Sequence, residues 1–231
     1  TTLFRSPYNE CLSAVYHNNI NTNQQELHVP VIGCVPLSIA RVMHFWQFPC
    51  NISWSSMSLN SANTFNKDFL ANVHTAVKSF NNSSMSFYYN PDGTTATDSL
   101  STSVSYLFSL GNFLIQTYGY SSATTISYSS NQYNTIIREM VDYERPVILQ
   151  GFINTNHSGG HAWVCDGYHY KFEHWYDSEM NPIGVETKKF HHCWGLPNSQ
   201  YDGWYNLTNM DHDGDGFSFI NDMILTYRIY P

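Results

Sequence analysis

Cys34 is the residue whose type and position best suit covalent chemistry. It follows Gly33 at the point where the helical pattern of residues 34–47 begins. The start of a helix offers backbone N–H groups without intrahelical partners and the positive end of the helix dipole, and both stabilise a thiolate. The same N–H groups, including that of Cys34, can receive the oxyanion of an attacked carbonyl. The alternative interpretation is a cysteine that packs as a small buried apolar side chain.

His161 is the second candidate. Gly159 and Gly160 lead directly into a β-prone run that His161 opens. Glycines let a substrate backbone approach closely, and a strand end holds an imidazole rigidly. A surface histidine is the alternative. Because Cys34 and His161 lie in different halves of the chain, helical half first, they fit a Cys-His dyad borne on the two sides of a cleft.

The elements that must position this pair follow from hydrophobic periodicity. Helical spacing occurs at 34–47, at 65–80, from Asp98 to Gly111 and from Asn131 to Met140. Short β-prone runs occur at 146–151, 161–168, 203–207 and 223–230, and 121–131 reads as a surface strand or loop. Helices followed by strands predict an α+β fold with an antiparallel sheet. We expect one domain over 1–231, mainly helical over 1–145 and mainly β over 146–231.

Composition narrows the function classes. Ten Lys and Arg against 18 Asp and Glu give a net charge of −8, and only 12% of residues are charged. The scattered basic residues provide no footprint for a phosphate backbone, so nucleic acid is not an expected partner. Each apolar run is shorter than a membrane span. The chain begins at Thr1 without a leader, which suggests a removed signal or propeptide and a secreted, extracellular protein.

Several motifs together resemble the streptopain family of papain-like cysteine peptidases. They are Ser6-Pro7-Tyr8-Asn9, Gly33-Cys34-Val35 with Ile39 to Met43 and Phe48-Pro49, Arg145 to Gly151, Gly159 to Tyr168, Trp194-Gly195, and Tyr201 to Leu207. The resemblance runs from about Ser6 to the C-terminus, with the middle, 50–143, matched only by its helical pattern.

The resemblance implies a papain-like bilobal fold with the active-site cleft between a helical and a β lobe. It implies a secreted endopeptidase made as a zymogen, with Cys34 as nucleophile, His161 as base, Trp194 packing the imidazole, and no catalytic cofactor. Gly159, Gly160 and Gln150 are expected to line the substrate cleft. Protein or peptide substrates are the expected partners, and the oligomeric state is left open.

Two departures from the family pattern concern polar groups that support catalysis. An ungapped alignment puts the oxyanion-hole Gln on Phe4, which has no donor, and the Asn that orients the catalytic His on Cys193. A local shift of the alignment would let Gln150 or Asn198 serve instead. The alternative function is therefore a catalytically impaired family member that binds peptide or protein in the same cleft.

An acidic loop near the C-terminus has the spacing of a calcium site. Oxygen donors stand at positions 1, 3, 5 and 12 of an EF-hand-like stretch, namely Asp211, Asp213, Asp215 and Asp222, with Gly216 at position 6. This predicts a structural Ca²⁺. An Asp/Gly-rich turn is the alternative, and a calcium-stabilised adhesion or scaffold module is a third function class that only this loop supports.

The five cysteines and several histidines leave two further interpretations open. Cys165, His169, His174, His191, His192 and Cys193 offer enough nitrogen and sulfur for zinc, although their spacing matches no common finger and a strand pair rich in surface histidine explains them equally. The sequence also permits Cys11–Cys50 and Cys165–Cys193 disulfides without requiring either.

Overall fold

A computed structural model describes residues 15–18, 25–57, 64–81, 87–89, 109–155, 160–195, 202–207 and 219–231. Its helices are α1 (Cys34–Trp46), α2 (Thr64–Asn81), α3 (Leu110–Tyr118) and α4 (Tyr133–Val141), with short 3₁₀ turns η1 (Trp54–Ser56) and η2 (Ser130–Gln132). Its strands are β1 (Val15–Asn18), β2 (Gln25–Val31), β3 (Phe87–Tyr89), β4 (Ser122–Ser127), β5 (Val147–Phe152), β6 (Gly160–Tyr176), β7 (Pro182–Cys193), β8 (Gly203–Tyr205) and β9 (Asn221–Tyr230).

The strands form two antiparallel sheets. The larger has the order β4-β9-β5-β6-β7-β8, and the smaller has the order β1-β2-β3. The predicted α+β class with an antiparallel sheet is confirmed. Strand β4 lies in the stretch 121–131 that was expected as a surface strand or loop, and its pairing with β9 makes it part of the larger sheet. Among the described residues, no helix is both long and apolar enough to cross a membrane.

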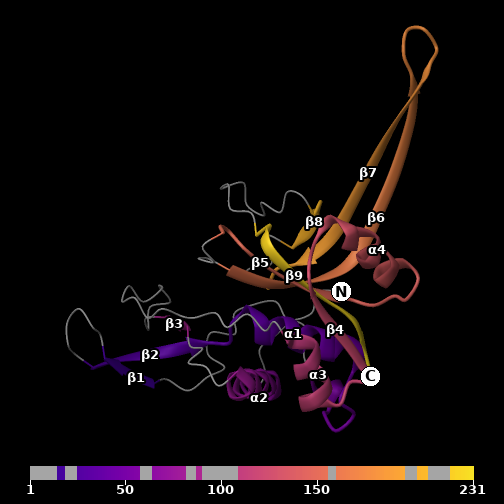
Figure 1. Ribbon diagram of the computed structural model, residues 1–231. Helices are drawn as coiled ribbons and strands as arrows, with labels where there is room; N and C mark the ends of the chain where they lie inside the picture. Colours follow the sequence, from indigo (N-terminus) through magenta and orange to yellow (C-terminus); the bar gives the residue numbers. More distant parts are fainter. Residues whose placement is uncertain are drawn as a thin grey trace.

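The hydrophobic core lies on both faces of the larger sheet. On one face, Ile148, Ala162 and Val164 pack with α1, α2 and α3; on the other, Leu149 and Trp163 pack with α4 and Phe219. All six residues of β5 are buried, since successive side chains of a strand point to opposite faces. The sheet is thus enclosed where β5 and β6 run through its centre (Figure 1).

Helix α1 is the best-buried of the described helices; it begins at Cys34 as predicted and ends one residue before the predicted end at 47. Residues 35–43 are all buried. Pro36 lies in the first turn, where its missing N–H costs nothing, and the chain leaves the helix at Gln47 in the left-handed conformation before Pro49. The helix packs against β6, which brings its first residue to the start of that strand.

The third predicted helix is wrong in its described part. We expected it to end at Gly111, but α3 begins at Leu110 and ends before Gly119, which has φ 76°. Gly119 is therefore the left-handed C-terminal glycine. Gly111 has a packing role instead, because a Cβ there would lie 2.6 Å from the carbonyl oxygen of Ala123 in β4. Residues 98–108 lie outside the described part of the chain.

Strands β6 and β7 pair over almost their whole length and form a ribbon that projects far beyond the other strands (Figure 1). The β-prone runs of the sequence end β6 near Tyr168 and include none over β7, where a strand pair rich in histidine was only the alternative to zinc. A β-bulge at Asp166 interrupts the pairing near the base, between Cys165↔His192 and Gly167↔His191. The outer part of the ribbon exposes several large apolar side chains, namely Tyr170, Phe172, Trp175, Tyr176, Met180, Ile183 and Val185.

Candidate active site

Cys34 is the first residue of α1 and is partly exposed. Gly33 before it has φ 85°, a conformation that glycine adopts easily, and no side chain caps the helix start. Three backbone N–H groups, those of Ala162, Cys34 and Val35, act on the pKa of this thiol. Burial raises the pKa of the Cys34 thiol, and these three N–H groups act in the opposite direction because they stabilise the thiolate. One of them belongs to β6, so the start of α1 meets β6 directly after His161.

The imidazole of His161 is held in one orientation. Its Nε2 lies 2.7 Å from the backbone carbonyl oxygen of Trp194. A carbonyl can only accept a hydrogen bond, so Nε2 donates and the neutral ring keeps its unprotonated nitrogen at Nδ1. His161 is only 9% exposed. The ring is therefore prepared to accept a proton at Nδ1.

Aromatic rings enclose this imidazole. The ring of Trp194 stacks on His161 at a centroid distance of 5.9 Å, Trp163 lies parallel to it at 6.3 Å, and Phe219 is at 5.4 Å. Trp163 donates its indole N–H to Nδ1 of His192 over 2.5 Å, and burial lowers the pKa of His192 to about 3. His192 thus remains neutral and fixes the indole that flanks His161. The expected packing of Trp194 against the imidazole is present.

Two charged side chains that sequence analysis did not assign to the site hold the segment that carries the Trp194 carbonyl. The Arg41 guanidinium donates through Nη1 to the Cys193 carbonyl over 2.7 Å, and the Trp194 N–H donates to Oδ1 of Asp202 over 2.7 Å. Gly195, the next residue, passes close to Leu37 of α1: a Cβ on Gly195 would lie 2.8 Å from the Leu37 side chain, so the backbone can approach the helix only as glycine. Arg41 could have been found from the sequence, because it is a charged residue among the apolar residues of helix 34–47. In the structure its side chain is only 5% exposed.

The other expected site residues fall in different places. Gly160 opens β6 opposite Phe152, and Gly159 lies outside the described residues. Gln150 pairs with Ala162 on β5; it is fully buried, and its amide has no hydrogen-bond partner among the described residues. Phe4 and Asn198 also lie outside the described residues, so the positions of the oxyanion Gln and of the orienting Asn in the family pattern stay open.

Cys193 ends β7 and does not face the imidazole of His161. Its thiol lies 3.5 Å from Oδ2 of Asp166 and 3.8 Å from Nδ1 of His191. Cys165 lies on the neighbouring strand but packs in the core on the opposite face of the sheet, and both thiols are free. The Cys165–Cys193 disulfide that the sequence permits is therefore not formed. Cys50 is free and exposed, and Cys11 is outside the described residues.

Of the four expected calcium ligands, the structure describes only Asp222. It is an exposed residue near the start of β9 with φ 43°. Asp211, Asp213 and Asp215 lie outside the described residues. The calcium site therefore stays a prediction.

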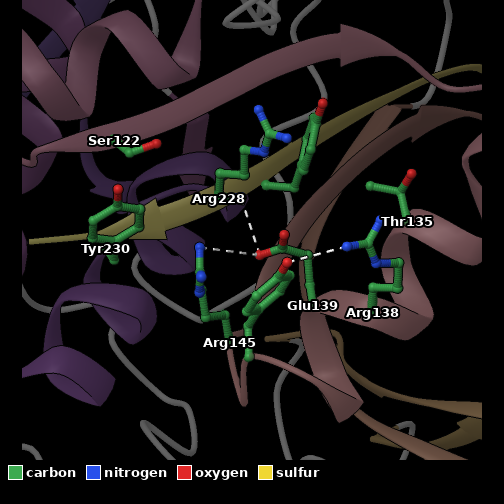
Figure 2. A pocket seen from close by; sticks show the side chains of 9 residues that line it. Ser122, Thr135, Arg138, Glu139, Arg145, Arg228 and Tyr230 are labelled. Atoms are coloured by element: carbon green, nitrogen blue, oxygen red, sulfur yellow. Dashed lines mark hydrogen bonds and ion pairs between the residues drawn. The ribbon is translucent and has the colours of Figure 1, made fainter.

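A separate cavity of about 340 Å³ lies between α4, β4 and β9. Figure 2 shows Glu139 at its centre, where Oε2 lies 3.9 Å from Nη1 of Arg145 and accepts the Arg228 backbone N–H over 3.2 Å. Burial raises the pKa of the Glu139 carboxyl, and Arg145 opposes this shift. Arg138 donates to the Tyr143 hydroxyl over 3.1 Å. No cysteine or histidine lines this cavity, and the Glu139 carboxylate already pairs with Arg145. We therefore do not take it as the catalytic site.

Two comparisons with known proteins found a match, one to a family and one to a solved fold. The model of the peptidase C10 family matches residues 4–205. Among solved structures, the fold is similar to the active wild-type interpain A cysteine protease of Prevotella intermedia, with a TM-score of 0.65 and 17% sequence identity over 100% of this chain and 93% of that one. A search of curated proteins found no match.

Proposed function

The chain belongs to the peptidase C10 family, and on this premise we propose that it is a secreted cysteine endopeptidase with Cys34 as nucleophile and His161 as general base and acid. The observation that carries the proposal is the contact that orients His161: the Trp194 carbonyl oxygen lies 2.7 Å from Nε2. In support, the backbone N–H of Ala162, the residue after His161, acts to lower the pKa of the Cys34 thiol against the effect of burial. Together they support a thiol and an imidazole prepared for proton transfer at Nδ1.

The proposed reaction begins when Nδ1 of His161 takes the thiol proton of Cys34. The thiolate sulfur then attacks the peptide carbonyl carbon, and the resulting oxyanion accepts hydrogen bonds from N–H groups at the start of α1. The imidazolium returns its proton to the leaving amine as the C–N bond breaks. Water, losing a proton to His161, attacks the acyl-enzyme and releases the carboxylic acid with the free thiol.

The Trp194 carbonyl gives this mechanism a replacement for the missing orienting Asn. An Asn side chain would accept from Nε2–H through its amide oxygen, and a backbone carbonyl offers the same kind of acceptor. Cys193, which stands where that Asn is expected, is then not needed for orientation. Its backbone carbonyl instead takes the Arg41 hydrogen bond that steadies the segment.

The oxyanion hole departs from the family pattern at Phe4. If Phe4 stands in place of the Gln, one donor is lost, and such a loss costs about a hundredfold to a thousandfold in rate. This favours, as the second candidate function, an impaired peptidase that retains a peptide-binding cleft. Secretion and a removed propeptide are further parts of the proposal and rest on the family resemblance alone.

Labelling and turnover test the proposal together. The purified protein is treated with an epoxide probe for thiol peptidases and assayed on casein, beside Cys34→Ala and Cys165→Ala variants. We expect prompt labelling confined to Cys34, with casein cleavage that is lost in Cys34→Ala and kept in Cys165→Ala. Labelling without turnover would favour the impaired member. If Cys34 reacts no faster than free cysteine and casein stays intact, the enzyme proposal fails.

We also propose that the loop from Asp211 to Asp222 binds a structural Ca²⁺ through its oxygen donors. Adding CaCl₂ is then expected to raise the melting temperature, and MgCl₂ is expected to do so less, because the larger cation accepts more ligands. An Asp213→Ala variant, which lacks the oxygen donor at position 3, with an undiminished calcium response would refute the site.

A further inference from the structure

We propose that Asp166, His191 and Cys193 form a Zn²⁺ site that is separate from the Cys34 and His161 centre. One ligand atom from each residue lies within 4.8 Å of the other two. Asp166 lies four residues beyond Ala162 along β6, which is about 13 Å of extended chain from the contact with Cys34. The inference does not depend on peptidase activity.

The fold brings the three side chains together through the β-bulge. His191 and Cys193 are two residues apart on β7, so their side chains share a face of the sheet. Asp166 is the extra residue of β6 and has no cross-strand partner in β7, which leaves its side chain free to turn toward that face. Gly167 keeps the space open, since a Cβ there would lie 3.0 Å from the Cβ of His191.

The distances between the donor atoms are close to those of a tetrahedral zinc site. With bond lengths usual for zinc, the edges of the tetrahedron are about 3.6 Å for sulfur to nitrogen or oxygen and about 3.4 Å for nitrogen to oxygen. The Cys193 thiol lies 3.8 Å from Nδ1 of His191 and 3.5 Å from Oδ2 of Asp166. The third edge, Nδ1 of His191 to Oδ1 of Asp166, is 2.6 Å and has to open when the metal replaces the shared proton.

The donor set selects a borderline transition metal. A thiolate, an imidazole nitrogen and a carboxylate suit Zn²⁺, whereas Ca²⁺ and Mg²⁺ require oxygen donors throughout. In the metal-free protein, burial and the neighbouring carboxylates of Asp166 and Asp202 raise the pKa of the Cys193 thiol, so the thiol is neutral. Zinc binding forms the S–Zn bond and releases the thiol proton to water. The thiolate and carboxylate then balance the charge of the ion.

A zinc ion from solvent can reach the three ligands, and they leave room for the coordination number that zinc prefers. The side chains of Asp166 and His191 are 20% and 27% exposed, whereas Cys193 is only 6% exposed. Solvent therefore reaches the cluster from the side of the two harder ligands. Three protein ligands leave the fourth tetrahedral position to water. Because the Cys193 carbonyl binds Arg41, the metal would anchor the end of β7 that precedes Trp194.

Cobalt substitution and zinc titration test the site. The full chain carries Cys34→Ala in every experiment, so that the Cys34 thiol cannot bind metal. We expect one Zn²⁺ per chain by competition with a chromophoric chelator, and a thiolate-to-Co²⁺ charge-transfer band in the near ultraviolet. Cys193→Ser is expected to abolish the band, and His191→Gln and Asp166→Asn to weaken zinc binding by at least about a hundredfold.

Two matched controls replace residues of the same types outside the site. Cys165→Ala changes a cysteine on the other face of the ribbon, and His169→Gln changes an exposed histidine of β6. Both variants are expected to bind zinc as the parent does. Melting curves check that each variant is folded. If Cys193→Ser does not fold, the two variants at the partly exposed positions decide. The proposal is overturned if the parent shows no charge-transfer band, if the band persists in Cys193→Ser, or if His191→Gln and Asp166→Asn bind zinc as the parent does.

Discussion

The base and the arm of the β6–β7 ribbon share one antiparallel ladder but differ in what surrounds it. In the base, residues 160–168 and 190–195, Trp163, Phe190 and Trp194 are at most 1% exposed. In the arm, residues 169–189, Trp175 is 44% and Tyr176 63% exposed, and the ion pairs, such as Lys188 with Glu186, lie at the surface.

This difference shows that backbone pairing alone does not make a site. In the base, each functional group is fixed from several directions: His161 by the Trp194 carbonyl and three rings, and Trp194 by Asp202. Such groups keep one geometry because the surrounding core leaves no alternative. In the arm, equally regular strands carry large side chains that are exposed to solvent, with no core around them.

The largest expected effect contrasts two tryptophans of the same strand. Trp163→Ala in the base is expected to lower the free energy of unfolding by about 3 to 5 kcal/mol, because it removes a fully buried ring and leaves a cavity. Trp175→Ala in the arm is expected to change it by less than about 0.5 kcal/mol. Denaturant unfolding of both variants measures the difference. Equal losses would mean that the arm is packed against something in solution.

The hydrogen bond from Trp194 to Asp202 gives the next effect. Asp202→Ala removes the acceptor of the Trp194 N–H and so loosens the carbonyl that orients His161. The loss of one such hydrogen bond, about 1.4 kcal/mol, corresponds to a decrease of about tenfold in kcat on a small peptide substrate. Asp202→Asn keeps an oxygen acceptor and is expected to restore most of kcat, with KM little changed in both variants. Asp177→Ala, which removes a turn carboxylate in the arm, is the control. A similar kcat in Asp202→Ala and Asp202→Asn would contradict the positioning role.

A pH effect on stability is expected from His74, which lies in the helical lobe and outside the ribbon. Burial lowers its pKa below 6.5, with Lys78 acting in the same direction and the Ile32 carbonyl, 2.9 Å from Nδ1, opposing it. The unfolded chain therefore binds a proton more readily than the native one. Stability is fully present above pH 6.5 and falls as the pH drops from 6.5 toward the lowered pKa.

His74→Gln is expected to reduce this loss, seen as a flatter dependence of the urea midpoint between about pH 7.5 and about pH 5.5. His174→Gln, at an exposed position in the arm, is the matched substitution and is expected to leave the dependence as it is. If the two variants have the same profile as the parent, acid sensitivity originates elsewhere.

The smallest expected effect is that of shortening the arm. Replacing residues 172–186 with Asn-Gly joins Lys171 and Thr187, which already pair, through a two-residue turn. Cleavage of a small peptide is expected to stay within about twofold of the parent, since these residues lie beyond the base and are mostly exposed. A large loss of kcat would show that the arm takes part in catalysis and would remove the contrast between the two regions.

Sequence patterns predicted the elements whose conformation is determined by nearby residues, as helix α1 shows. Helix α1 begins as expected and ends one residue before the expected end, because Gly33, Pro36 and Pro49 act on the chain nearby. Strand β7 is not among the predicted β-prone runs because its polar residues, with Lys188, Lys189 and two histidines, show no clean alternation. Its pairing with β6 determines its conformation instead.

The reactive groups of the candidate site could be predicted from the sequence, but the contacts that position them could not. Cys34 and His161 are identifiable because few residue types supply a nucleophile and a base. The contact of Arg41 with the Cys193 carbonyl joins residues 152 positions apart, and the Trp194 acceptor is a backbone oxygen, which any residue type provides. No residue pattern in a single sequence encodes such contacts.

The pH dependence of Cys34 alkylation tests the central claim most directly. Iodoacetamide is reacted with the parent and with His161→Ala, and the labelled residue is identified by mass spectrometry. The parent is expected to react rapidly well below pH 9, the ordinary thiol pKa, because proton transfer to His161 and the N–H groups around the sulfur stabilise the thiolate against the effect of burial. His161→Ala is expected to lose this reactivity. Equal rates in both proteins, rising only at or above pH 9, would contradict a Cys34–His161 dyad.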